Sequence, residues 1–222
     1  MRKRFFATIA GSLGYLFLAL LCLIQWSGPG VWGRVDFFAG GYLGLRFLSA
    51  IYSLFSSHAA FQSNVRLKRW WGQDSDSRWT SRVKLLMAAD LTVFLDYGHW
   101  RLTPSLAQPV LQMAGLTLYM GVVAWQTWTD SRLAKHFSED HHEFLTSGPY
   151  RYIRHPRYAA AVVGKIAMAL TLTSSLGWLL AATWTILLLR QATLEEKHLR
   201  SLFGSDYEDY MQRTARLLPG IY

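Results

Sequence analysis

The chain has 222 residues, of which 51% are hydrophobic, and a formal net charge of +9. Its apolar residues form long uncharged runs, which argues against a soluble globular protein. The basic residues gather between these runs, where membrane topology and anionic lipid explain them better than nucleic acid does. The single cysteine, Cys22, excludes an internal disulfide and cysteine-based metal sites.

Four runs in the first 130 residues predict membrane-spanning helices, near 5–25, 35–56, 84–101 and 109–129. The first run follows three basic residues, as a signal peptide would, but no small-x-small cleavage site follows it, so we expect it to be retained. Residues 62–83 are polar and include three tryptophans, which suits a loop at the membrane interface.

The second and third runs contain charged residues, among them Arg46, Asp90 and Asp96. Charged side chains at membrane depth are costly, so they usually face a partner or a water-filled cavity. We expect Arg46 to pair with Asp90 or Asp96, and a role in a substrate pocket is the alternative.

Residues 158–189 are uncharged except for Lys165 and are too long for one span and too short for two. A single helix of this length would measure about 48 Å, against an apolar membrane core of about 30 Å. Thr173-Ser-Ser-Leu-Gly177 offers turn residues in the middle. We therefore predict a hairpin of helices, with the first near 156–173. The second should begin near 175, leave the membrane near Arg190, continue as a polar helix to 215 and end before Leu218-Pro219-Gly220.

These elements predict an all-α, polytopic membrane helix bundle: four N-terminal spans, then a helical hairpin with an extended last helix. We expect one integral membrane domain, with a four-span bundle in 1–130 and a cofactor-binding catalytic part in 131–222. If the chain crosses the membrane at each successive span, all of its basic segments lie on the same side. Basic segments stay on the cytoplasmic side, which predicts cytoplasmic N- and C-termini.

The segment before the hairpin is "HHEFLTSGPYRYIRHPRY", 141–158. Gly148-Pro149 and Pro156 would break a long helix, so we expect the segment between them to be a connection with a defined shape. Pro156 suits the first turn of the next helix, whose amide groups could hold an anionic ligand group beside His155 and Tyr158. The alternative is that the arginines of this segment bind phospholipid headgroups while its tyrosines form an aromatic belt.

Glu195 and Glu196 follow the last apolar run, and adjacent positions on a helix point about 100° apart. Glu195 lies on an apolar stripe, so we expect it to face inward, either as an ion-pair partner of Arg154 or as the receptor for a cationic ligand. Glu196 precedes Arg200 by four residues, which favours a surface ion pair.

Other signals for catalysis are weak. His141-His142 lacks a third ligand at a typical spacing, so we predict no metal site. The sequence contains no glycine-rich dinucleotide fingerprint, phosphate-binding loop or nucleophile elbow.

Together, the two C-terminal segments resemble the isoprenylcysteine carboxyl methyltransferase family, its bacterial relatives and the phospholipid methyltransferases. The first matching segment contains His142, Phe144-Leu-Thr-Ser-Gly-Pro-Tyr150 and Arg154-His-Pro-Arg-Tyr158. The second contains Glu195-Glu196, Leu199, Phe203-Gly204, Tyr207, Tyr210, Arg216 and Pro219. The resemblance covers roughly residues 130–222.

The resemblance implies a membrane methyltransferase that uses S-adenosylmethionine without a Rossmann domain and acts on a lipophilic acceptor, such as an isoprenoid-like carboxylate or a lipid amine. The implied cofactor-binding residues are His142, Glu143, Phe144, Leu145, Gly148, Tyr150, His155, Pro156, Arg157, Tyr158 and Glu195. Arg154 and Glu195 are the expected catalytic residues, and Arg190 and Gln191 the expected substrate contacts. An inward carboxylate and aromatic faces suit the sulfonium and ammonium groups of this cofactor.

One departure from the family concerns the acceptor. Gln191 stands where the prenylcysteine enzymes have a substrate-contacting arginine, which weakens the case for a prenylcysteine carboxylate. A phospholipid amine, a quinone-like ring and a small volatile apolar molecule stay open as acceptors.

Two other functions stay open. An NADPH-dependent membrane sterol or enone reductase has a similar C-terminal architecture, including an Arg-His-Pro motif and a tail like "RLLPGIY". A non-catalytic membrane scaffold is the other alternative, in which neither His155 nor Glu195 would contribute to ligand binding.

Overall fold

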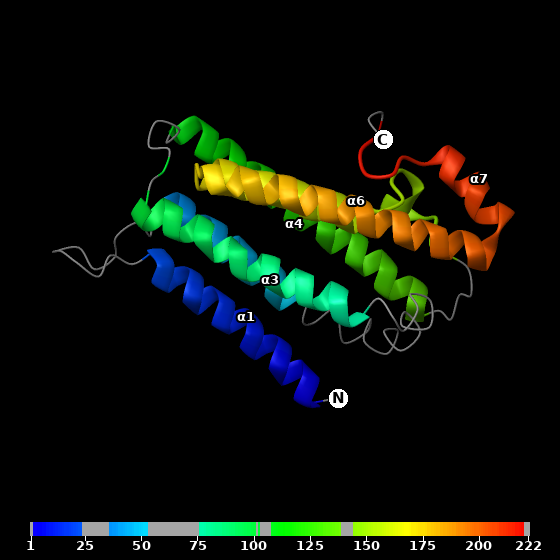
Figure 1. Cartoon of the computed structure of the whole chain (residues 1–222), viewed down its shortest axis with the longest axis horizontal. Helices are drawn as coiled ribbons and strands as arrows, with labels where there is room; N and C mark the ends of the chain where they lie inside the picture. Colours follow the sequence, from blue (N-terminus) through cyan, green and yellow to red (C-terminus); the bar gives the residue numbers. More distant parts are fainter. Residues whose placement is uncertain are drawn as a thin grey trace.

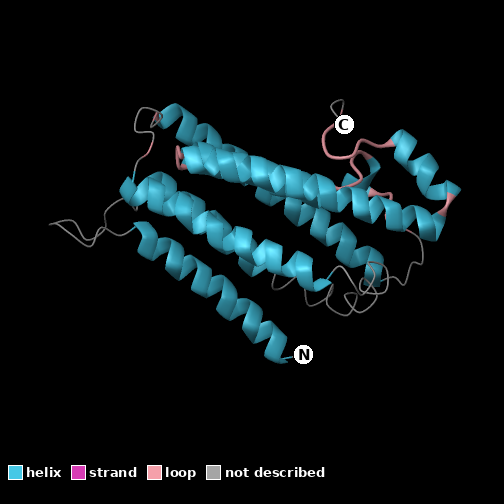
Figure 2. Cartoon of the chain, in the orientation of Figure 1, coloured by secondary structure: helices cyan, strands magenta, loops and turns pink. Residues whose placement is uncertain are grey.

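The structure is a computed structural model that describes residues 2–23, 36–52, 76–100, 102, 108–138 and 144–219, and these form helices and connecting turns (Figure 1; Figure 2). The helices are α1 (Arg2–Leu23), a helical segment at 37–52, α3 (Asp76–Leu95), α4 (Pro109–Ser138), α5 (Pro156–Thr171), α6 (Ser175–Phe203) and α7 (Ser205–Arg213). A π-helical turn, Asp96–Trp100, extends α3, and a 3-10 turn, Gly148–Arg151, lies in the connection before α5. The predicted all-helical class is confirmed.

The helix boundaries correct several predictions. Residues 76–83 belong to α3, so this part of the predicted polar loop is wrong, and 62–75 lie outside the described residues. The last helix does not continue to 215, because Gly204 adopts a positive φ of 55° and separates α6 from α7. A glycine at this position ends a helix without the steric cost that a side chain would add.

The predicted hairpin between α5 and α6 is confirmed. The Ser174 side chain caps α6 by accepting a hydrogen bond from the Gly177 amide at 3.3 Å. Gly177 lies so close to α5 that a Cβ atom there would stand 2.9 Å from the Cα of Ala169. The two helices therefore leave the turn in close contact, and α5 packs between α4 and α6.

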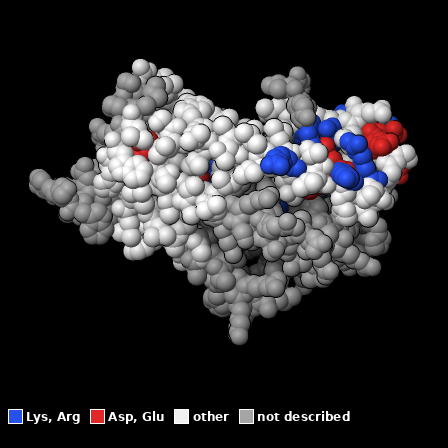
Figure 3. Space-filling model, in the orientation of Figure 1, with Lys and Arg blue, Asp and Glu red and all other residues white. Residues whose placement is uncertain are grey.

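The bundle interior is aromatic and aliphatic, with Tyr42, Phe94, Tyr119, Met168 and Leu172 in one cluster. Over the described residues, no helix is both long enough and apolar enough to cross a membrane. The charged side chains on the visible face gather at the end that holds α7 and the C-terminal half of α6 (Figure 3). Of the two ends of α1, its start lies nearer to α7, and the last described residues lie beside α6 and α7 (Figure 1).

The predicted pairing of Arg46 is wrong. Asp90 of α3 is fully buried, and its carboxylate forms an ion pair with Lys165 of α5. Asp96 accepts hydrogen bonds from the hydroxyl of Ser174 and, at 3.0 Å, from the amide of Leu102. Arg46 instead lies over the ring of Tyr15, 5.2 Å from its centre.

Candidate active site

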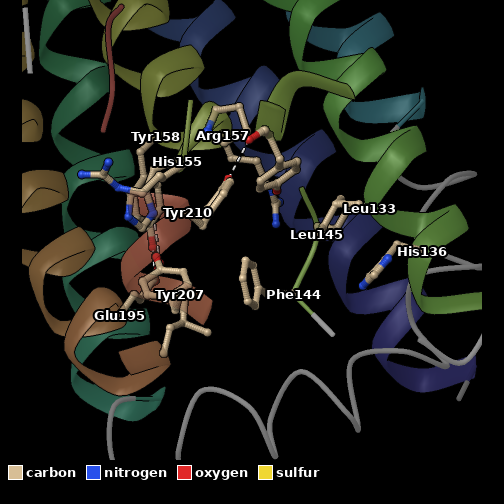
Figure 4. A pocket seen from close by; sticks show the side chains of 14 residues that line it. Leu133, His136, Phe144, Leu145, His155, Arg157, Tyr158, Glu195, Tyr207 and Tyr210 are labelled. Atoms are coloured by element: carbon tan, nitrogen blue, oxygen red, sulfur yellow. Dashed lines mark hydrogen bonds and ion pairs between the residues drawn. The ribbon is translucent and has the colours of Figure 1, made fainter. Parts of the chain in front are cut away.

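A cavity of about 150 Å³ lies at the charged end of the bundle, enclosed by the ends of α4 and α6, the connection 144–155, the start of α5, and α7 (Figure 4). Nine predicted site residues line it: Phe144, Leu145, Tyr150, Arg154, His155, Pro156, Arg157, Tyr158 and Glu195. Two segments far apart in the sequence therefore meet around one cavity, as the two motifs predicted.

Some predicted site residues lie elsewhere. Arg190 is exposed and Gln191 is half-buried, and neither lines the cavity; the Gln191 amide donates to Glu195 Oε1 at 3.2 Å. His142 and Glu143 lie outside the described residues. Gly148 is next to the cavity rather than part of its lining, and it begins the 3-10 turn with a φ of 64°.

The connection is held in shape by the C-terminal segment 214–217. The Arg154 amide donates to the Ala215 carbonyl at 2.8 Å, and the His155 amide donates to the Arg216 carbonyl at 3.1 Å. In return, the Ala215 amide donates to Tyr152 at 3.1 Å. These bonds form a short parallel bridge that fixes the backbone of the Arg-His-Pro motif.

Glu196 is buried, with 4% of its surface exposed, and this corrects the predicted surface pair with Arg200. Its Oε1 atom lies 2.9 Å from Nε of Arg154 and 3.2 Å from Nε2 of His155. Its Oε2 atom lies 3.1 Å from Nη2 of Arg216. The partner predicted for Glu195, Arg154, is therefore bound by its neighbour Glu196.

Glu195 faces the cavity and is 9% exposed. The Tyr158 hydroxyl donates to Glu195 Oε1, and Nδ1 of His155 lies 3.6 Å from Oε2 (Figure 4). The His155 and Tyr158 rings stack nearly parallel, with centres 5.4 Å apart. Glu195 thus presents a negative charge to the cavity, held in place by two aromatic side chains.

The charges of this cluster are mutually dependent. Burial alone would raise the pKa of Glu196, but hydrogen bonds from His155 and Arg154 outweigh burial and lower it to about 2. Burial alone would lower the pKa of His155, but its hydrogen bonds to both glutamates raise it. The geometry therefore favours ionised Glu196 beside a protonated His155.

Aromatic rings form another wall. Phe144 packs edge-on against Tyr207 with centres 5.2 Å apart, and its centre lies 5.2 Å from that of Tyr210. The Tyr210 hydroxyl donates to the Tyr150 carbonyl at 2.6 Å, which fixes α7 against the connection. These rings surround the space that Glu195 faces (Figure 4).

The start of α5 offers less to an anion than predicted. The amides of Tyr158 and Ala159 both donate to the His155 carbonyl at 3.0 Å, so they are satisfied within the chain. Arg157, whose side chain is 45% exposed, forms an ion pair with Asp130 at 3.2 Å. Arg157 is thus the more accessible positive group on this side of the cavity.

Five lining residues were not assigned to the site from the sequence: Leu133, His136, Leu199, Tyr207 and Tyr210. The last three belong to the matching segment, so the motif contained a signal for them. Leu133 and His136 lie on α4 beyond the predicted end of its span at 129, and no motif marked them. Within the described part of the chain, no three His, Cys, Asp or Glu side chains are grouped to share a metal ion.

Residues 110–206 match a family model described as phospholipid methyltransferase. The chain is 27% identical over 186 residues to methanethiol S-methyltransferase 1 of Bradyrhizobium diazoefficiens. This alignment covers 75% of this chain and 64% of that protein. It is 33% identical over 87 residues to a protein of Oryza sativa subsp. japonica named probable protein-S-isoprenylcysteine O-methyltransferase, with 37% of this chain and 44% of that protein covered. The protein-S-isoprenylcysteine O-methyltransferase of Dictyostelium discoideum is 27% identical over 145 residues, 60% of either chain.

The matched residues 110–206 include Arg154-His-Pro-Arg-Tyr158 and Glu195, and each of these relatives is named as a methyltransferase. The chain is similar to phospholipid and isoprenylcysteine methyltransferases, which supports the resemblance that its sequence motifs indicated. It spans less than two thirds of the length of each of the three relatives. The reductase alternative receives no support from them, because each is named as a methyltransferase.

Proposed function

We propose that the chain is a membrane-embedded, S-adenosylmethionine-dependent methyltransferase that acts on an apolar acceptor. The observation that supports this most is the cavity in which the Glu195 carboxylate faces aromatic rings. A buried carboxylate and π-faces together attract a cation, and S-adenosylmethionine has both a sulfonium and an ammonium group. The side chains present therefore fit this cofactor.

In this proposal, Glu195 and the faces of Tyr158, Tyr207 and Tyr210 hold the cationic part of the cofactor, and Arg157 is placed to contact its carboxylate. When bound, the cofactor supplies an electrophilic methyl group on a sulfonium sulfur. The protein then has to align the acceptor in line with that methyl group and keep water out, which is where proximity accelerates a displacement at carbon. The aromatic wall and Leu145 provide the dry surface.

An apolar groove supports an apolar acceptor. It has a volume of about 1180 Å³ and runs between α4 and α5, with Met113, Leu118 and Val163 among its lining residues. At one end, the Trp125 indole lines the groove and donates to the carbonyl of Pro156, which lines the cavity, at 3.2 Å. The groove and the cavity are therefore neighbours on either side of the start of α5.

We favour a thiol as the methyl-accepting group. The alignment with a relative named methanethiol S-methyltransferase covers 75% of this chain, against 37% for the Oryza protein named for isoprenylcysteine. Gln191 is bound to Glu195, and Arg190 points to the exposed face, so neither offers the cavity a guanidinium to orient a carboxylate. A lipid amine is the second candidate, supported by the family model over 110–206.

We also propose that the long helices form a single multi-pass membrane domain, with 131–222 as its catalytic part and both termini on the cytoplasmic side. The gathering of charged side chains around α7 supports this orientation for the C-terminal part of the chain (Figure 3). Labelling of cysteines introduced at exposed positions, such as Lys197 and Arg213, in intact cells and in inverted vesicles tests it. Labelling from outside the cell would contradict it.

The proposed reaction is tested with the full chain in lipid nanodiscs and methyl-labelled S-adenosylmethionine. Three acceptors are offered in parallel: a short alkanethiol, an N-acetyl-S-farnesylcysteine and phosphatidylethanolamine. We expect labelled thioether from the thiol, with Glu195→Gln as the inactive control. Binding of NADPH without binding of S-adenosylmethionine would overturn the proposal.

A further inference from the structure

Glu196 joins three parts of the chain that come from different places in the sequence. It lies on α6, while its partners Arg154 and His155 lie in the connection before α5, and Arg216 lies in the C-terminal segment 214–217. The side chains of Glu196, Arg154 and Arg216 are only 6%, 11% and 9% exposed. At this burial, each charge depends on the others, because water does little to screen or solvate it.

Arg154 and Arg216 form further hydrogen bonds with other parts of the chain. Nη1 of Arg154 donates to the carbonyl of Met211 at 2.8 Å and also to that of Thr214. Nη2 of Arg216 donates to the hydroxyl of Thr193 on α6 at 2.6 Å. The two arginines thus tie the end of α7 and the C-terminal segment to α6 through the carboxylate of Glu196.

The balance of charge connects this cluster to the cavity. Arg154, Arg216 and a protonated His155 place three positive charges around Glu196, and His155 also lies 3.6 Å from Glu195, which faces the cavity. Ionised Glu196 offsets part of this positive charge, so the cavity beside Glu195 attracts a cation more strongly than it would without Glu196. Without the charge of Glu196, Glu195 would be the acid that compensates these cations, and the cavity would attract a cation less strongly.

We propose that Glu196, together with Arg216, is a positioning residue that locks the C-terminal segment onto the Arg154-His155 connection and reserves Glu195 for a cationic ligand. This inference rests on the proposed function, because it assigns the cluster to recognition of the sulfonium. Neither residue lines the cavity, so neither touches the ligand itself.

The test compares Glu196→Gln and Arg216→Met with the unmodified full chain in nanodiscs. Glu196→Gln keeps the shape and one oxygen acceptor but removes the charge. Two ligands separate the electrostatic role from a structural one: S-adenosylmethionine has the sulfonium charge, and S-adenosylhomocysteine lacks it. Glu208→Gln, on the exposed side of α7, is the matched control.

We expect Glu196→Gln to weaken binding of S-adenosylmethionine by about tenfold, a 1.4 kcal/mol change, and that of S-adenosylhomocysteine by about threefold or less. A merely structural role would weaken both equally, and that result, or no change in either, would overturn the proposal.

A measurement without ligand separates this inference from the proposed function. Hydrogen exchange should become at least about tenfold faster at the amides of Arg154, His155 and Ala215 in both cluster variants, because these amides close the parallel bridge. If the unmodified chain bound neither adenosyl ligand, the proposed function would fall, while unchanged exchange in the variants would overturn the positioning role on its own.

Discussion

Lys165 of α5 and Asp90 of α3 form an ion pair inside the bundle, with side chains only 9% and 1% exposed. Nζ of Lys165 also lies 4.9 Å from the ring centre of Trp184 on α6. Lys165 therefore connects α5, α3 and α6 inside the bundle. Removal of one partner from a buried pair leaves a charge without compensation, which costs far more than removal of both.

Lys165→Met should accordingly lower the free energy of unfolding by about 3–5 kcal/mol. The double variant Lys165→Met with Asp90→Leu should recover most of that loss, because it removes both charges of the pair together. Denaturant unfolding in detergent measures both, with the exposed Lys197→Met as control. Equal losses in the single and double variants would show that packing, rather than charge, determines the effect.

Glu195→Gln should weaken binding of S-adenosylmethionine by at least about tenfold, since the carboxylate that faces the aromatic wall loses its charge. The stability of the chain should change less than the affinity, because the amide can still accept from Tyr158 and His155 keeps its bond to Glu196. Equilibrium binding of labelled cofactor measures the change, and Asp209→Asn on the exposed side of α7 controls for net charge. Unchanged affinity would remove Glu195 from the cofactor site.

The parts of the fold that depend on local chemistry were predictable. Thr173 to Gly177 contain a helix cap and a glycine at a close approach, and the turn forms there. Pro149 and Pro156 predicted a shaped connection, and a 3-10 turn followed by the start of α5 is what forms. In each case, the residues that decide the conformation lie next to each other in the sequence.

The parts that depend on long-range partners were not predictable in the same way. The spacing of Glu196 and Arg200 favours a surface pair, and helical spacing cannot show that Arg216 and Arg154 approach from other segments. The same holds for Asp90, because the sequence cannot show which of the two cations in the apolar runs, Arg46 or Lys165, binds it. The end of α6 at Gly204 is different, because a glycine after an amphipathic run is a known stop signal that the prediction overlooked.

The pH dependence of stability should have two limbs. The raised pKa of His155 contributes stability that is complete below its ordinary value of 6.5 and is lost as the pH rises through the raised value. The depressed pKa of Glu196 contributes stability that is present above its ordinary value of 4.5 and is lost as the pH falls toward about 2.

Thermal unfolding between pH 2.5 and 9 should therefore show the highest stability near pH 4.5–6.5 for this cluster. His155→Gln should flatten the alkaline limb, and Glu196→Gln the acidic one. Stability that rose steadily from pH 6.5 to 9 would contradict a protonated His155 between the two glutamates.

Gly148 should tolerate a side chain poorly, because its φ of 64° disfavours other residues and a Cβ atom would stand 3.0 Å from Cγ of Arg132. Gly148→Ala should cost about 1–2 kcal/mol of stability and shift the connection that presents Tyr150 to the cavity. Gly121→Ala is the matched control, because its Cβ would meet nothing within 4 Å on α4 and alanine favours a helix. Cofactor affinity and thermal unfolding, measured on both variants, should fall for Gly148→Ala alone; equal behaviour of the two would show that the turn does not shape the site.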